Sequence, residues 1–326
     1  MDERPRRKLI IQIPCFNEEA ALPVTLAELP RAVPGFAQVE WMVIDDGSSD
    51  RTVEVARAHG VDHIVRLRSH QGLARGFMAG LEAALEAGAD VIVNTDADNQ
   101  YAAGDIPALV APILEGQADM VIGARPIGNI AHFSPLKKLL QRLGSAVIRF
   151  VSKTEVHDAP SGFRAISRET AMRLNVFSEY TYTLETIIQA GQKGMAVVSV
   201  PVRVNRELRP SRLMKGMSAY VRRSLVTMLR IFVTYRPFRF FMAVALAVFS
   251  GGLLLGFRYL YFVAIGEGTG HVQSVILAAL LMGGGVVFGI VGILADLISV
   301  NRKLLEQIKW KLAKVEERIR RLEERP

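Results

Sequence analysis

Cysteine is nearly absent from this sequence of 326 residues, in which Cys15 stands alone. A single cysteine excludes an internal disulfide and a zinc site built from cysteines, and it favours a reducing, cytoplasmic setting. The N-terminal region lacks the long apolar core of a signal peptide, because its apolar run covers only 9–13 and is interrupted by Gln12. With no internal repeat or low-complexity tract evident, the chain has room for one large or two modest domains.

Acidic residues are scarce between Arg203 and Arg239, where Glu207 stands against a series of arginines and lysines. Apolar residues recur between the basic ones at helical spacing, which predicts an amphipathic helix on an anionic membrane surface. The net charge of +8 also favours an anionic partner. A nucleic-acid-binding helix is the alternative, but the hydrophobic segments that follow argue against it. We therefore expect no nucleic-acid partner.

Hydrophobic residues make up 50% of the chain, and their excess lies between 238 and 300. Segments 240–265 and 272–295 are each long enough to cross the roughly 30 Å hydrocarbon core of a bilayer. A buried helical hairpin is the alternative, but it would need a larger soluble domain around it. Basic residues flank both segments, so the positive-inside rule predicts a multi-pass protein of the inner (plasma) membrane with both termini and the N-terminal domain in the cytoplasm.

Strands and helices alternate before residue 200, and glycines end several of the helices. The predicted strands are 8–14, 40–47, 63–67, 90–96 and 119–125, and the predicted helices are 18–33, 48–60, 72–88 and 103–117. Such alternation predicts an α/β fold with a mostly parallel sheet covered by helices. The expected domains are an α/β domain at 1–205, the basic interfacial segment at 206–237, two transmembrane helices within 238–300 and a C-terminal helix at 301–326.

The stretch "NTDADNQY" places Asp96 and Asp98 directly after a predicted strand. Alternation along an extended chain points both side chains the same way. Taken alone, the pair fits a solvated turn. However, "IPCFNEE" (13–19), "DDGSSD" (45–50) and "DAPSGFRAISRE" (158–169) also follow strands or the sheet, where ligands bind in such folds. Facing carboxylates repel unless a cation lies among them, and oxygen ligands without His or Cys indicate Mg²⁺ or Mn²⁺ bridged to a substrate diphosphate.

These clusters resemble those of family-2 glycosyltransferases of the A-type nucleotide-sugar fold, which is Rossmann-like. The closer likeness is to polyprenyl-phosphate glycosyltransferases, the group that contains dolichol-phosphate mannose synthase. It covers 8 to about 215 in motif order, and the two-helix hairpin matches the bacterial members. The combination of "DADNQY" and "SGFR" is specific. The resemblance implies a membrane-bound, inverting hexosyl transfer from a nucleotide-diphosphate sugar to an undecaprenyl or dolichyl phosphate.

The resemblance also implies roles for individual residues. The residues implied to contact the donor nucleotide are Pro14, Phe16, Glu18, Asp45, Asp46 and Asp96. The residues implied to surround the metal and the diphosphate are Asp96, Asp98 and Gln100. The residues implied at the acceptor phosphate are Arg125, Lys138, Arg142, Ser211 and Arg212. Because 126–134 has no fixed register, Lys137 or Arg142 could take the place of Lys138, and the loop with Ser211 and Arg212 is a candidate lid.

The expected catalytic residues are Asp98, Arg125, Asp158 and Arg164. Asp158 could orient the acceptor or an arginine, or it could cap the following turn. Arg164 is expected to bind phosphate or to pair with an acid at a strand end, and Glu185 is expected to have a structural role. A phosphomonoester loses its second proton near a pKa of about 6, so the acceptor needs no general base.

Two other hypotheses concern the function. A processive polysaccharide synthase shares this fold, but it is expected to carry a Gln-x-x-Arg-Trp motif and more transmembrane helices. That motif is missing, and "QIKW" at 307–310 lacks the arginine. A catalytically silent membrane scaffold is the second alternative, and the intact acidic clusters argue against it.

The C-terminal segment repeats apolar residues at alternating spacings of three and four. They are Leu305, Ile308, Leu312, Val315, Ile319 and Leu322. This is the a/d pattern of a coiled coil, and with the small residues at 283–292 it predicts a homo-oligomer. A single amphipathic helix that packs on its own chain or on the membrane is the alternative.

Overall fold

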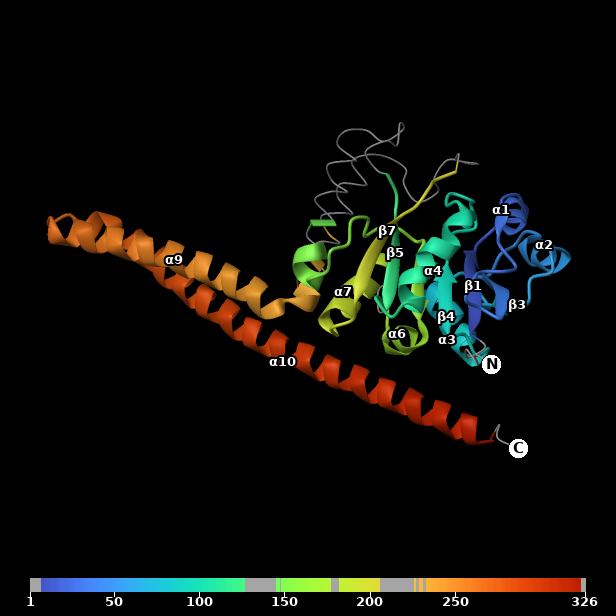
Figure 1. Ribbon diagram of the computed structural model, residues 1–326. Helices are drawn as coiled ribbons and strands as arrows, with labels where there is room; N and C mark the ends of the chain where they lie inside the picture. Colours follow the sequence, from blue (N-terminus) through green and yellow to red (C-terminus); the bar gives the residue numbers. More distant parts are fainter. Residues whose placement is uncertain are drawn as a thin grey trace. The chain divides into compact units, whose positions relative to one another are not determined.

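The computed structural model describes residues 7–126, 145–146, 148–176, 182–205, 226, 229–230 and 233–323. Two compact units make up the chain, Met1–Ser224 and Leu225–Pro326. The first unit contains the sheet, and the second contains two long helices (Figure 1).

The described part of the first unit contains a seven-stranded sheet (Figure 1). Its strands, in spatial order, are β3 (His63–Arg66), β2 (Gln38–Asp45), β1 (Lys8–Cys15), β4 (Val91–Asn94), β6 (Arg164–Ser167), β5 (Met120–Ala124) and β7 (Val197–Pro201). The pairs β1–β2, β1–β4, β2–β3 and β5–β7 are parallel, whereas β6 runs antiparallel to both β4 and β5. The predicted mostly parallel α/β sheet is confirmed.

Helices cover both faces of this sheet. Those within the described residues of the first unit are α1 (Leu22–Glu28), α2 (Thr52–Ala58), α3 (Leu73–Glu86), α4 (Ile106–Leu114), α6 (Arg168–Arg173) and α7 (Thr183–Gln192), with the short turn η1 (Ala103–Asp105) before α4. Alternate residues of β1 enter a core that also contains apolar residues of α1, α2 and α4. On the other face α3 approaches closely, since a Cβ at Gly80 would lie 2.8 Å from Ile44 Cδ1.

The first helix begins later than the sequence predicts. α1 begins at Leu22 rather than at residue 18, because the preceding backbone is bonded to the loop after β2. There the amides of Asn17 and Glu18 donate to Ser48 Oγ (2.9 Å) and Thr52 Oγ1 (2.8 Å). These hydrogen bonds fix the loop after β1 against the loop after β2.

Strand β6 was not predicted, and its direction matters for the site. Asn94, the last residue of β4, pairs with Arg164, the first residue of β6. An antiparallel strand therefore begins at the edge where its parallel neighbours end. The segment 158–163, which leads into β6, consequently reaches the carboxyl ends of the other strands, the edge that binds ligands in open α/β sheets.

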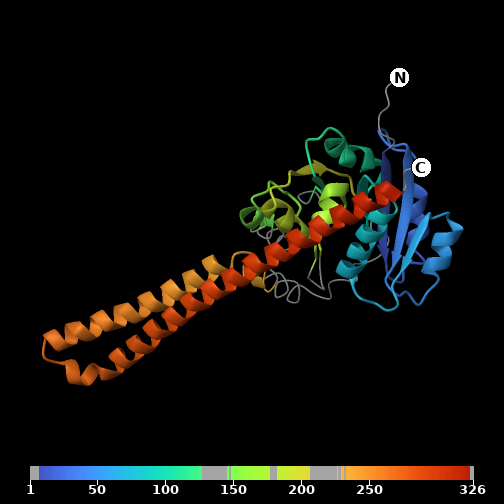
Figure 2. The same cartoon turned by 90° about the horizontal axis from the view of Figure 1, so that it is seen from below.

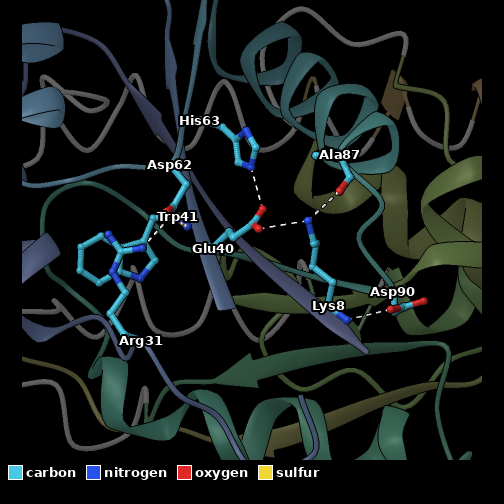
Figure 3. A network of polar contacts seen from close by, with 8 residues as sticks. All are labelled: Lys8, Arg31, Glu40, Trp41, Asp62, His63, Ala87 and Asp90. Atoms are coloured by element: carbon cyan, nitrogen blue, oxygen red, sulfur yellow. Dashed lines mark hydrogen bonds and ion pairs between the residues drawn. The ribbon is translucent and has the colours of Figure 1, made fainter. Parts of the chain in front are cut away.

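A polar network ties together the opposite part of the strands (Figure 3). Glu40 of β2 accepts from Lys8 Nζ at 3.0 Å and contacts His63 Nε2 at 2.7 Å, so three neighbouring strands are linked. Burial opposes ionisation of Glu40, but the hydrogen bonds from His63 and Lys8 outweigh it and lower the pKa of this carboxyl. The amide of Trp41 donates to Asp62 Oδ2 at 2.7 Å, which holds the turn before β3.

The long elements described in the second unit are α9 (Pro237–Ala264) and α10 (Val272–Glu323), with the short turn η3 (Gly268–His271) between them. α9 lies along the first half of α10 in both views (Figures 1 and 2). Glycines permit this close approach: a Cβ at Gly285 would lie 2.8 Å from Phe249 Cβ, and one at Gly292 would lie 3.0 Å from Phe241 Cβ. These two members of the small-residue run therefore serve packing within the chain.

Each of the two long helices contains a stretch that is long and apolar enough to cross a membrane. In the most apolar 18-residue window, only 11% of the residues of α9 and 17% of those of α10 are buried. The two predicted spans coincide with α9 and the first part of α10. The predicted C-terminal helix is not separate, because α10 continues without a break to Glu323.

Candidate active site

The loops after β1 and β2 form one wall of the candidate site. Asp45, at the end of β2, is fully buried; its Oδ1 accepts from the Ser48 amide at 3.0 Å, and its Oδ2 lies 3.2 Å from Arg66 Nε. Asn17 has a φ of +55° and its Oδ1 accepts from the Ser49 amide at 2.8 Å. Glu18 is buried beside these groups. The acidic residues after β2 thus shape the loops at this strand end.

Asp46 fixes the loop that leads into α3. Its two carboxylate oxygens accept from the amides of Gln71 (2.7 Å) and Gly72 (2.8 Å). Oδ2 also lies 2.8 Å from His70 Nδ1. The His70 ring stacks on the ring of Phe16, with centroids 3.9 Å apart. An aromatic pair is therefore held at the wall formed by the loops after β1 and β2.

Asp96 and Asp98 follow β4, as the sequence predicts. The Asp98 carboxylate accepts from the Gln100 amide at 3.2 Å, which turns the chain back towards the sheet. Asn99, which lies between Asp98 and Gln100, has a φ of +55°. Among the described residues, no hydrogen-bond donor reaches the carboxylate of Asp96. This oxygen pair is therefore available to a ligand.

The surroundings of Asp96 disfavour its negative charge. Burial and, next, the neighbouring charge of Asp98 raise the pKa of Asp96 to about 7, and Glu18 adds to this effect. Arg125 and Arg164 act in the opposite direction. A bound cation would relieve the repulsion between the two carboxylates. The charges of Asp96 and Asp98 thus oppose each other in this structure.

Arg125 and Asp158 form a buried, bidentate ion pair. Arg125 Nε lies 2.6 Å from Asp158 Oδ2, and Nη2 lies 3.0 Å from Oδ1. The Arg125 amide also donates to Oδ2 at 3.2 Å. The guanidinium stands 6.0 Å from the centroid of the Tyr101 ring. Asp158 therefore contacts a neighbouring arginine, as one of the alternatives for this residue requires.

Arg164 lies beneath the site and is fully buried. Its guanidinium donates to the carbonyl oxygens of Thr183 (3.2 Å) and Ser161, and to Thr186 Oγ1 at 2.6 Å. It also stands 5.2 Å from the ring centroid of Tyr182. The sequence favoured phosphate binding or pairing with an acid, but these hydrogen bonds go to neutral groups. Complete burial, which the sequence could not reveal, explains the difference.

Several neighbours of Asp96 were not predicted. The Gly162 amide donates to Tyr101 Oη at 3.0 Å, and Asn94 Nδ2 donates to Gly162 O at 2.9 Å. A Cβ at Gly162 would lie 2.9 Å from both Asp96 oxygens, so only glycine leaves this carboxylate its place. Tyr101 and Gly162 belong to the motifs "NQY" and "SGF", and the position of these motifs beside the acidic residues could have indicated that both residues lie at the site. No motif indicates a place at the site for His70.

The remaining predicted site residues lie outside the part of the chain that the structure describes. They are Lys137, Lys138, Arg142, Ser211 and Arg212. Glu185 is buried on α7, in agreement with a structural role. Within the described residues there is no group of three or more His, Cys, Asp or Glu that could hold a metal. The two carboxylates of 96 and 98 would need further oxygen ligands, such as those of a phosphate, to complete a coordination shell.

Comparisons with known proteins agree with this geometry. Residues 10–174 match the family described as glycosyl transferase family 2. The undecaprenyl-phosphate mannosyltransferase of Micrococcus luteus is 30% identical over 64% of this chain and 88% of that protein. The polyprenol monophosphomannose synthase of Mycolicibacterium smegmatis is 29% identical over 64% of this chain and 82% of that protein.

A solved structure shows the same fold with ligands. Glucosyl-3-phosphoglycerate synthase from Mycobacterium tuberculosis, in complex with Mn²⁺, UDP-glucose and phosphoglyceric acid, is 25% identical. The match has a TM-score of 0.53 and covers 68% of this chain and 79% of that one. With an α/β sheet of this order and an acidic pair at the end of β4, the chain belongs to glycosyl transferase family 2 and is a glycosyltransferase.

Proposed function

We propose that the protein transfers a sugar from a nucleotide-diphosphate sugar to a polyprenyl phosphate. One observation carries this proposal: the paired carboxylates Asp96 and Asp98 lie near the buried Arg125–Asp158 pair, in a chain that also has two apolar helices. The first group suits a metal-bound diphosphate, the second supplies a fixed cation for a phosphate, and the helices suit a lipid acceptor. The names of the relatives from Micrococcus luteus and Mycolicibacterium smegmatis support the acceptor class.

Asp96, Asp98 and Gln100 would hold Mg²⁺ or Mn²⁺. The residues fit such an ion, because Asp96 has an unshared carboxylate whose pKa is raised by burial and by Asp98. Hard cations of this kind use one or two carboxylates and complete their shell with phosphate oxygens and water. When bound, the ion would supply positive charge to the departing nucleoside diphosphate. The related synthase from Mycobacterium tuberculosis contains Mn²⁺ with UDP-glucose.

The donor nucleotide would lie against the wall formed by the loops after β1 and β2. Pro14 and Phe16 supply apolar and aromatic surface there, and Glu18, Asp45 and Asp46 shape the loops. Because Asp45 and Asp46 hold backbone amides in place, the wall is ordered before the donor arrives. Preorganised walls of this kind reduce the ordering cost of binding.

The transfer is an inverting displacement without a general base. An oxygen of the acceptor phosphate forms a bond to the anomeric carbon, and the bond from that carbon to the diphosphate oxygen breaks with both electrons going to the diphosphate. The acceptor phosphate, with its second pKa near about 6, already carries a nucleophilic oxygen at neutral pH. Arg125 would draw it in, and Asp158 would hold the Arg125 guanidinium in one orientation. Arg164 would act from beneath as a buried positive charge near Asp96.

The acceptor phosphate would also meet basic residues of 127–144 and 206–225, namely Lys138 or its neighbours Lys137 and Arg142, and Arg212 with Ser211. The two long helices would anchor the enzyme in the inner (plasma) membrane. The excess of basic residues on both flanks would put the catalytic unit and both termini on the cytoplasmic side.

A screen tests the proposal. Purified protein is incubated with radiolabelled nucleotide sugars, Mg²⁺ or Mn²⁺, and either undecaprenyl phosphate or 3-phosphoglycerate. We expect label in the lipid phase with at least one donor, and none of it with Asp98→Asn. Label on 3-phosphoglycerate alone would indicate a water-soluble acceptor, polymer would indicate a polysaccharide synthase, and no turnover of any donor would leave a silent scaffold. Each of these three outcomes contradicts the proposal.

A further inference from the structure

The last part of α10 carries an apolar stripe that faces solvent. Its described members are each half or more exposed: Leu305 (66%), Ile308 (62%), Leu312 (57%), Val315 (54%) and Ile319 (50%). α9 does not cover them, because its first residues already lie beside Gly292. An exposed stripe of this length indicates a surface that another helix covers.

The stripe does not lie in the part of α10 that suits a lipid core. Between 302 and 323 the helix is rich in lysine, arginine and glutamate, which the hydrocarbon core excludes. Successive apolar residues here are three and four positions apart, a period of 3.5. This is the spacing at which two helices keep facing each other as they supercoil, with positions a at 305, 312 and 319 and positions d at 308, 315 and 322.

The charges beside the stripe indicate the partner and its direction. In a parallel, in-register pair, each g residue faces the e residue of the partner's next heptad. Lys311 at g then meets Glu316 at e, and this contact joins opposite charges. An antiparallel pair would instead bring g positions, such as that of Lys311, against one another. We therefore infer that residues 305–323 of two copies of this chain form a parallel, in-register coiled coil.

The continuity of α10 agrees with this direction. One uninterrupted helix runs from Val272 to Glu323, so the stripe is a direct extension of the apolar span. In two copies that span one membrane, the two stripes would lie on the same side of the membrane and run in the same direction. This arrangement raises their effective concentration for pairing. Leucine at a with a β-branched residue at d, as in the first two heptads, also permits bundles of more than two strands. The inference does not depend on the proposed transfer reaction.

Single cysteines test the register in full-length protein reconstituted at a low protein-to-lipid ratio. The native Cys15 is buried, so unmodified protein gives the background. In the parallel arrangement equal a positions meet, and we expect oxidised dimers for both Leu305→Cys and Ile319→Cys. The matched control Gln307→Cys, on an exposed position outside the stripe, should stay at background. An antiparallel pair would separate each of the two end positions from its equivalent by about 21 Å.

Charge reversal tests the same contact independently. In the Ile319→Cys background, Lys311→Glu places like charges opposite each other and should lower the crosslinked fraction several-fold. Adding Glu316→Lys should restore it, because the pair is again opposite in sign. Circular dichroism and size-exclusion chromatography check that every variant is folded. Crosslinking that is equal at Gln307, absent at both end positions, or reduced by the first substitution without rescue by the second would overturn the inference.

Discussion

Replacing Asp158 with Asn would leave the Arg125 guanidinium buried without a carboxylate partner. The side chains of this pair are only 8% and 1% exposed, and two hydrogen bonds join them. Removing one partner of such a buried pair costs about 3–5 kcal/mol. For a unit of this size, each kcal/mol lowers Tm by about 2–4 °C. We therefore expect Asp158→Asn to unfold roughly 6–20 °C lower than the unmodified protein.

The assay follows the catalytic unit by the fluorescence of Trp41. Because the chain contains two tryptophans, Trp310→Phe gives a background in which Trp41 of β2 is the only emitter. Urea titration and a thermal ramp then report unfolding of the sheet. The matched control is Asp105→Asn, which breaks a similarly short but exposed pair with Arg203 (2.7 Å), where water screens the charges. Its effect should be much smaller.

A second variant separates charge burial from lost packing. Asp158→Asn combined with Arg125→Gln removes both charges, so the double variant should be more stable than Asp158→Asn alone. A strictly additive loss in the double variant, or an unfolding free energy for Asp158→Asn within about 1 kcal/mol of the unmodified protein, would refute the reasoning.

Four further predictions follow from the same geometry. Asp98→Asn should weaken Mn²⁺ binding and lower turnover by orders of magnitude in a folded protein. Calorimetric titration with Mn²⁺ measures the binding, and undiminished activity of the unmodified protein in excess EDTA would contradict a role for the metal. Because the pKa of Asp96 is raised to about 7, protons should compete with the metal for this carboxylate below that pH. The Mn²⁺ affinity should then fall by up to about tenfold for each unit of pH below 7. Calorimetric titration between pH 5.5 and 8 measures this dependence, and an affinity that does not change with pH would contradict it. Gly162→Ala should displace the Asp96 carboxylate and abolish most activity, whereas Gly76→Ala, whose Cβ would meet ordinary contacts of 3.9 Å, should retain it. Because the pKa of Glu40 is lowered from 4.5, its contribution to stability is present above that pH and is lost as the pH falls through the folded value; Glu40→Gln should therefore destabilise the protein at pH 7 and flatten its acid unfolding, as measured by urea titration.

Much of the sheet could be predicted because its central strands are short apolar runs that end in polar clusters. β6 escaped prediction because it has four residues and begins with an arginine, which carries no strand signal on its own. The start of α1 was placed too early, because the amides of Asn17 and Glu18 bond to side chains some 30 residues away. Contacts between distant segments depend on sheet order, which the local pattern does not contain.

The candidate site shows the same division. Asp96 and Asp98 could be found because two acids and a glutamine follow one strand. The partner of Asp158 could not be chosen from the sequence, since Arg125 is 33 positions away and β5 and β6 bring the two together only in the fold. The complete burial of Arg164 could not be foreseen, because a motif does not show burial. The roles of Lys138, Arg142, Ser211 and Arg212 stay predictions.

The antiparallel direction of β6 has a consequence for how such enzymes diversify. β5 ends at Ala124 and its neighbour β6 begins at Arg164, so everything between them leaves and re-enters the sheet at one edge. The Arg125–Asp158 pair ties the two ends of this excursion together at its base. Lengthening a loop of fixed ends costs only about 0.6 kcal/mol per doubling. With its two ends joined in this way, the segment between β5 and β6 can change in length at little cost to the sheet that carries Asp96 and Asp98.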